Sequence, residues 1–218
     1  MALARLDAVL PADPPTELLL SLHAGFIGKY GDDPDEYEYA MSEFLRMNGM
    51  YWGVAAMDLM GRLNNMDRDK IIEFLVACQD PQSGGFRPVQ GHDPHILNTL
   101  SAVQVAVTLD CLDQLDTEGV VRYVVARQQE DGSFTGDRFG HTLRLTQRLT
   151  LFRWGERDNR FGFCALATLA LLGRLDAVDT ELAAEFVCRA HTTIFNDCKG
   201  LVELTFYYFI SLNLCQPC

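Results

Sequence analysis

A repeated pattern of helix-forming segments constrains the fold of this chain more than any other feature of its sequence. Three segments begin at Asp67, Asp116 and Asp179, and aspartate can accept a hydrogen bond in the first turn of a helix. Apolar residues recur in each segment at i, i+3, i+4 and i+7, the spacing that places them on one side of a helix. The sequence therefore predicts three amphipathic helices arranged as a repeat.

A glycine-containing loop follows each of the first two segments, at residues 79–86 and 128–134. Its glycines permit a positive φ where the helix ends, and its last residue, a phenylalanine, is predicted to fold back as an anchor. A second helix that is apolar on nearly every side is predicted after each loop, at 94–112 and 161–172. Because such helices must be enclosed, we expect an all-α fold in which outer amphipathic and inner apolar helices alternate, stacked as a solenoid or closed ring.

Two irregularities interrupt the repeat. The second unit is longer than the first by 15 residues, and residues 138–152 are the best location for this insertion. They are interpreted as a poorly ordered surface loop, in preference to a β-strand or an arginine-rich contact surface, because a lone strand has no partner for its backbone. After residue 190 the pattern stops. Residues 191–218 are a divergent tail whose apolar stretch, 201–214, is either a capping helix or, the favoured interpretation, sequence foreign to the repeat.

Charge and composition exclude several classes of function. A net charge of −12 disfavours binding to nucleic-acid phosphates. The sequence contains no uninterrupted apolar run of about 18 residues, and its N-terminus lacks a signal-peptide core, so a cytoplasmic protein is expected. The seven cysteines lack the spacing of a disulfide framework. Cys78, Cys111, Cys164 and Cys188 are predicted to be reduced and mostly buried.

The repeat resembles a known enzyme family. The segments that carry the resemblance are 35–53, 57–61, 91–104 and 164–173, and they look like the β subunit of Rab geranylgeranyltransferase. The resemblance covers residues 16–190 apart from the insertion, and leaves 1–15 as an N-terminal tail. It implies the α/α barrel, or toroid, of protein prenyltransferases, here as an incomplete ring. It also implies a zinc-dependent heterodimer with an α subunit. That enzyme transfers geranylgeranyl from its diphosphate to C-terminal cysteines of Rab GTPases presented by an escort protein.

The resemblance also indicates a lipid pocket. Trp52 and Phe163 match aromatic lining positions, while Asn48 and Leu100 match positions where geranylgeranyl enzymes carry smaller groups than the farnesyl enzyme. A twenty-carbon lipid requires such an apolar funnel. The alternative is that these side chains are ordinary core residues of an inner helix.

Catalytic and metal-binding residues are not identifiable from the sequence. In the family, the zinc ligands and the basic residues that hold diphosphate come from the second half of the ring, and this chain has no matching positions. His191, Asp197 and Cys198 are of the right types but lack the spacing, so no metal site is assigned. Two further candidates, 92–95 and 32–36, are interpreted as helix starts.

This chain alone is therefore expected to bind no zinc and to be inactive as a catalyst. A noncatalytic protein that binds or regulates the α subunit is the alternative function. A terpene-cyclase-like relative is a weaker one, because no Asp-x-Asp-Asp motif occurs.

Overall fold

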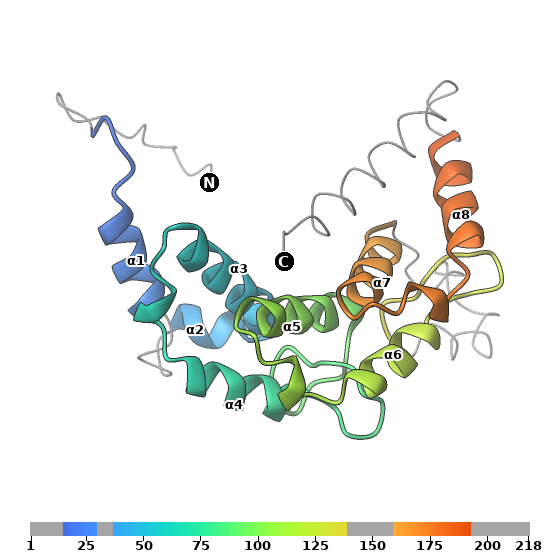
Figure 1. The fold of residues 1–218 in the computed structure, drawn as a ribbon, viewed down its shortest axis with the longest axis horizontal. Coiled ribbons are helices and arrows are strands. Elements are labelled where there is room, and N and C mark those ends of the chain that lie inside the picture. The colour runs from blue at the N-terminus through green and yellow to red at the C-terminus, as the bar shows by residue number, and fades with distance from the viewer. Residues whose placement is uncertain (1–14, 30–36, 139–158, 193–218) are drawn as a thin grey trace, which may run out of the picture.

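The computed structural model describes residues 15–29, 37–138 and 159–192 as a series of helices joined by turns and loops (Figure 1). The α-helices are α1 (Leu20–Lys29), α2 (Tyr37–Met41), α3 (Arg46–Leu59), α4 (Arg68–Cys78), α5 (Ile96–Thr108), α6 (Thr117–Val125), α7 (Asn159–Leu171) and α8 (Thr180–Thr192). Short 3-10 turns lie at η1 (Glu43–Leu45), η2 (Leu63–Asn65), η3 (Leu112–Gln114) and η5 (Leu175–Ala177). The all-α prediction is confirmed. The predictions for the N-terminal tail, the insertion and the C-terminal tail fall on residues that lie almost entirely outside the described ranges.

The three predicted outer helices begin at the predicted aspartates. Asp67 accepts a hydrogen bond from the backbone N–H of Lys70, at 3.2 Å. Asp116 and Asp179 do the same for the N–H group three residues further on, each at 2.8 Å. Each side chain thereby pairs one of the backbone donors that a helix leaves unsatisfied in its first turn. These contacts confirm the starts of α4, α6 and α8.

The inner helices are α3, α5 and α7, and α5 packs against both of the others. α5 is shorter than the predicted 94–112. His95 is its N-cap, and its Nδ1 accepts a hydrogen bond from the Leu97 N–H at 3.2 Å. At its other end Asp110 has a φ of +50°, which ends the helix before the 3-10 turn η3. Glycines with positive φ, Gly61 and Gly173, follow α3 and α7 in the same way.

A glutamine in each loop connects one repeat to the next. The side chain of Gln79 donates to the carbonyl oxygens of Gly84 and Asp116, at 3.1 and 3.0 Å, and accepts from the Asp116 N–H at 3.0 Å. Gln128 makes the equivalent pair with the backbone of Asp179, at 2.7 and 3.0 Å. We call these two contacts the glutamine clamps. Each fixes a loop to the residue that immediately precedes the following outer helix.

The loop glycines lie directly against that following helix. Gly84 has a φ of +82°, and a Cβ added there would lie 2.2 Å from backbone atoms of Gly119 in α6. Gly132, with a φ of +86°, approaches the backbone of Leu182 in α8 equally closely. Only glycine fits both the backbone conformation and the space. The predicted anchors Phe86 and Phe134 are buried in the core.

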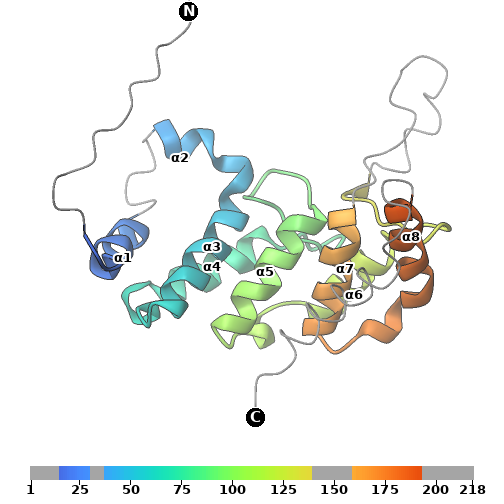
Figure 2. The ribbon, with the colours of Figure 1, turned by 90° about the horizontal axis from the view of Figure 1, so that it is seen from above.

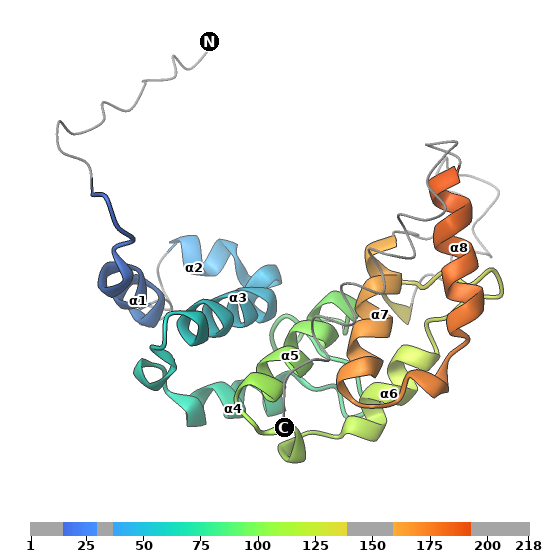
Figure 3. The same cartoon turned by 45° about the horizontal axis from the view of Figure 1, so that its top comes forward.

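The repeats together form an arc. In Figures 1 and 3 the inner helices α3, α5 and α7 lie along the concave side of the arc, and α4, α6 and α8 lie along its convex side. Figure 2 shows the same succession of helices from above. No helix in the described ranges is long and apolar enough to cross a membrane.

Candidate lipid-binding face

One side of α3, away from its buried residues, carries exposed apolar side chains. Leu45, Trp52 and Leu59 lie seven residues apart, so they share one side of the helix. Their side chains are exposed by 36, 59 and 88%. Met47 and Val54, on another side of α3, are fully buried. The helix therefore faces the core with one side and presents a second apolar side outward.

The neighbouring inner helices extend this surface. Leu100 and Val107 lie seven residues apart on α5; Leu100 is 6% exposed and Val107 is 40% exposed. Phe163 lies on α7 and is half-buried against the core. We call Leu45, Trp52, Leu59, Leu100, Val107 and Phe163 the concave face. It spans three helices that are adjacent in space but separated along the chain.

Asn48 lies on α3 and makes a polar contact to α5 that sequence analysis missed. The hydroxyl of Ser101 donates to its Oδ1 at 2.9 Å. This hydrogen bond joins residues 53 positions apart and places Asn48 beside the residue that follows Leu100. The four residues that sequence analysis assigned to a lipid pocket thus lie on neighbouring helices. Trp52 is not an enclosed core residue, whereas Leu100 is nearly buried.

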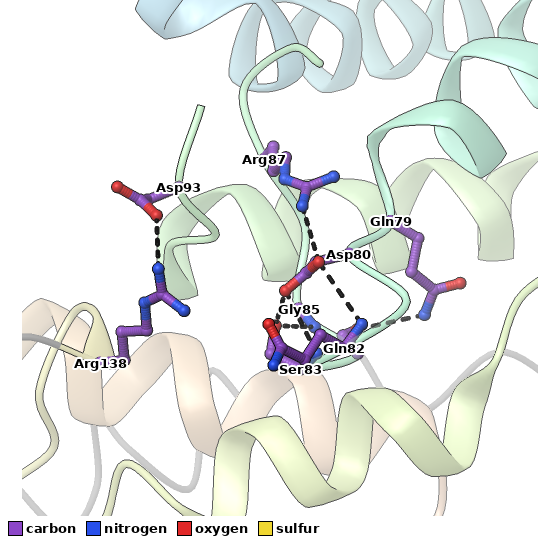
Figure 4. A network of polar contacts seen from close by, with 9 residues as sticks. Gln79, Asp80, Gln82, Ser83, Gly85, Arg87, Asp93 and Arg138 are labelled. Atoms are coloured by element: carbon purple, nitrogen blue, oxygen red, sulfur yellow. Dashed lines mark hydrogen bonds and ion pairs between the residues drawn. The ribbon is translucent and has the colours of Figure 1, made fainter. Parts of the chain in front are cut away.

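The polar residues before α5 have separate partners and do not converge. His92 Nε2 lies 3.3 Å from Glu43 Oε1. Asp93 accepts a hydrogen bond from Arg138 at 3.3 Å, as Figure 4 shows. His95 caps α5, so the interpretation of this segment as a helix start is confirmed. Residues 32–36 lie outside the described ranges, and the side chain of His191 is not described either.

The described side chains do not fit the zinc ion that the family resemblance implies. Among them, no group of three or more His, Cys, Asp or Glu residues is close enough together to hold a metal ion. The cysteines in this part of the chain are thiols: Cys78, Cys111 and Cys164 are buried and Cys188 is half-buried. Burial raises the pKa of the Cys78 thiol to about 11 and also raises the pKa of Cys111. Both therefore stay protonated near neutral pH and are poor nucleophiles or metal ligands.

A second polar network, in the first loop, satisfies itself (Figure 4). Asp80 accepts from the Ser83 hydroxyl at 2.7 Å, from the backbone N–H groups of Gln82 and Ser83, and from Arg87 at 2.6 Å. Burial would raise the pKa of Asp80, but the hydrogen bonds and the Arg87 charge outweigh burial and lower it. With its acceptor sites occupied, Asp80 fixes the loop and is not available for catalysis.

The fold and this face define an α/α repeat domain whose inner helices present an apolar surface. The sequence matches the prenyltransferase alpha-alpha toroid domain over residues 18–196, and the chain belongs to this family.

Individual relatives confirm the resemblance seen in the sequence. Over 177 residues the chain is 36% identical to the geranylgeranyl transferase type-2 subunit beta of Saccharomyces cerevisiae, a match that covers 80% of this chain and 50% of the relative. It is 32% identical to the Candida albicans subunit over 192 residues, covering 80% and 51%. A probable subunit from Caenorhabditis elegans is 44% identical over 104 residues, covering 48% and 31%. The chain thus spans about half the length of the first two relatives.

Proposed function

We propose that the concave face binds the geranylgeranyl chain of geranylgeranyl diphosphate. The observation that carries this proposal is the exposed apolar side chains of α3, together with the exposed Val107 on α5, the inner helix packed against α3. An extended isoprenoid has no hydrogen-bonding groups along its length, so its binding requires apolar surface of this kind. Shielding these side chains from water upon binding supplies the driving force.

Within this proposal, four residues have assigned roles. Trp52 and Phe163 contact the isoprenoid with their rings, and Leu100 forms the surface between them. Asn48 is held by Ser101 and limits the space beside α5. This assignment rests on the family resemblance together with the position of these residues on adjacent inner helices.

The reaction proposed for the complete enzyme is geranylgeranyl transfer to C-terminal cysteines of Rab GTPases. The cysteine thiol loses its proton to solvent, its sulfur forms a bond to C1 of the lipid, and the bond from C1 to the diphosphate oxygen breaks as diphosphate leaves. The partners are an α subunit and a Rab GTPase presented by its escort protein, in the cytoplasm. The described residues contribute the lipid-binding part of this reaction, and we assign them no metal ligand.

Lipid binding is tested with a fluorescent analogue of geranylgeranyl diphosphate and a matched pair of variants. Trp52→Glu places a charge on the concave face, and Val76→Glu places one on the outer helix α4, where Val76 is 50% exposed. We expect Trp52→Glu to weaken binding on the order of tenfold or more, because a carboxylate must be desolvated against the lipid. The Val76→Glu protein should bind like the unmodified chain. Equal affinities for the two variants would refute the proposed face.

Catalysis is tested by co-expression with an α subunit. Zinc content and geranylgeranyl transfer to an escorted Rab are measured on the purified complex. Stoichiometric zinc together with turnover supports the transferase. A complex that forms without zinc or turnover supports the alternative, a noncatalytic chain that occupies the α subunit.

A further inference from the structure

A buried arginine lies at the end of the outer helix α6. Arg127 is only 8% exposed, and its Nε and Nη1 are buried without a hydrogen-bond partner. In the described part of the chain, no carboxylate forms an ion pair with it. Its guanidinium carbon lies 5.0 Å from the centroid of the Tyr123 ring, a contact that offsets only part of the cost of burying the charge. Because an arginine keeps its charge when buried, this environment favours an anion.

A second unpaired polar atom lies on the strand-like segment opposite. The backbone N–H of Thr135 donates to the carbonyl oxygen of Arg127 at 3.1 Å, next to the antiparallel bridge between Gln128 and Phe134. Residues that lie opposite each other in this way point to the same side, with Cβ atoms about 5 Å apart. Thr135 is 4% exposed, and its hydroxyl is buried without a hydrogen-bond partner. One place in the second loop thus gathers a guanidinium and a hydroxyl.

The first loop shows how the same backbone arrangement can satisfy a cation. Arg87, which directly follows the phenylalanine of that loop, forms an ion pair with Asp80 at 2.6 Å (Figure 4). Asp80 directly follows the glutamine of its loop, and the second loop has Gln129 at that position. The amide of Gln129 carries no charge, and it donates to the carbonyl oxygen of Arg127 at 3.0 Å. The second loop therefore keeps a cation but replaces the acid by a neutral amide.

We propose that Arg127 and Thr135 bind a small tetrahedral oxyanion of the phosphate or sulfate class. The planar guanidinium can donate two parallel hydrogen bonds to two oxygens of such an ion, and the Thr135 hydroxyl can donate to a third. Both side chains are nearly buried, so the ion is largely shielded from water, where its attraction to a guanidinium is strongest. The site belongs to the loop after α6, in the outer row of helices, and it does not depend on lipid binding at the concave face.

The test measures phosphate binding to the full chain. The protein is dialysed into buffer free of phosphate and sulfate and titrated with sodium phosphate at constant ionic strength, by calorimetry and by thermal melting. Arg127→Leu removes the guanidinium, and Thr135→Val removes the hydroxyl but keeps the shape of the side chain. Arg122→Leu is the matched control, because it removes an arginine from the same helix whose side chain is 69% exposed.

We expect the unmodified chain and the Arg122→Leu control to bind one phosphate and to melt at a higher temperature as phosphate is added. Arg127→Leu should abolish this binding, and Thr135→Val should weaken it on the order of tenfold, since one hydrogen bond to an anion is lost. Without phosphate, Arg127→Leu should melt no lower than the unmodified chain, because it removes an unpaired buried charge. A purely structural arginine would lower the melting temperature in both buffers instead.

Three results would overturn the proposal. The first is an unmodified chain that binds neither phosphate nor sulfate. The second is an equal rise in melting temperature with the same concentration of sodium chloride, which would show only a general effect of salt. The third is phosphate binding by Thr135→Val that matches that of the unmodified chain. This third measurement keeps the proposal testable even if Arg127→Leu does not fold.

Discussion

The glutamine clamps make a quantitative prediction about what holds consecutive repeats together. Replacing Gln79 by methionine keeps the length and volume of the side chain but removes three hydrogen bonds, two donated and one accepted. Each such bond contributes about 0.5–1.5 kcal/mol, and the two to Asp116 are partly open to water, which can replace them. We therefore expect Gln79→Met to lower the free energy of unfolding by about 2 kcal/mol. Gln128 makes two such bonds to Asp179, so Gln128→Met should cost about 1 kcal/mol.

Urea unfolding followed by circular dichroism measures both changes. Gln82→Met is the matched control, because the hydrogen bond of Gln82 in the same loop comes from its backbone N–H and its side chain is exposed. The control should lie within about 0.5 kcal/mol of the unmodified chain. If Gln79→Met were no less stable than the control, or if Gln128→Met were the more damaging of the two, the clamps would not be what fixes the stacking.

Three other predictions concern single sites. Asp110→Gly should stabilise the chain by about 0.5–1 kcal/mol and raise its melting temperature, because Asp110 has a φ of +50° that glycine adopts without strain. Cys78 should resist alkylation by iodoacetamide at pH 8 until the chain unfolds, because its side chain is buried and its pKa is raised to about 11. The pKa of Asp80 is lowered by folding, so Asp80 stabilises the protein above its ordinary pKa of 3.8, and this contribution is lost as the pH falls through the lower folded value. Asp80→Asn should therefore reduce stability at pH 7 and flatten the acid branch of a pH titration of urea midpoints.

Local features of the fold could be predicted because their determinants are close in sequence. Asp67, Asp116 and Asp179 each pair with an N–H group three residues away, and periodicity alone identifies the helix that follows. The anchors Phe86 and Phe134 could be recognised from their position after a glycine turn. By contrast, the helix was predicted to continue to residue 112, whereas α5 ends at Thr108. Apolar residues continue past this end, and the periodicity of the sequence does not indicate the positive φ of Asp110.

The contacts between repeats could not be predicted from spacing. Gln79 pairs with a backbone 37 residues away and Gln128 with one 51 residues away, and the longer separation contains the predicted insertion. A signal was present nonetheless, since a glutamine begins both loops and an aspartate begins the helix that each contacts. Asn48 and Ser101 gave no comparable signal. Their hydrogen bond exists because α3 and α5 pack side by side, which only the tertiary structure shows.

The contacts that stack the repeats lie on the loops and outer helices, and the exposed apolar side chains lie on the inner helices. The glutamine clamps and the loop glycines contact the backbone of the outer helices and of the residues just before them. The arrangement of the repeats therefore does not depend on side chains such as Trp52. An exposed residue with no part in stacking can be changed at little cost in stability, within about 0.5 kcal/mol. Trp52→Glu and Gln79→Met should therefore have different effects, one on ligand binding and the other on stability. The first should alter binding and leave unfolding nearly unchanged, and the second should weaken the fold first.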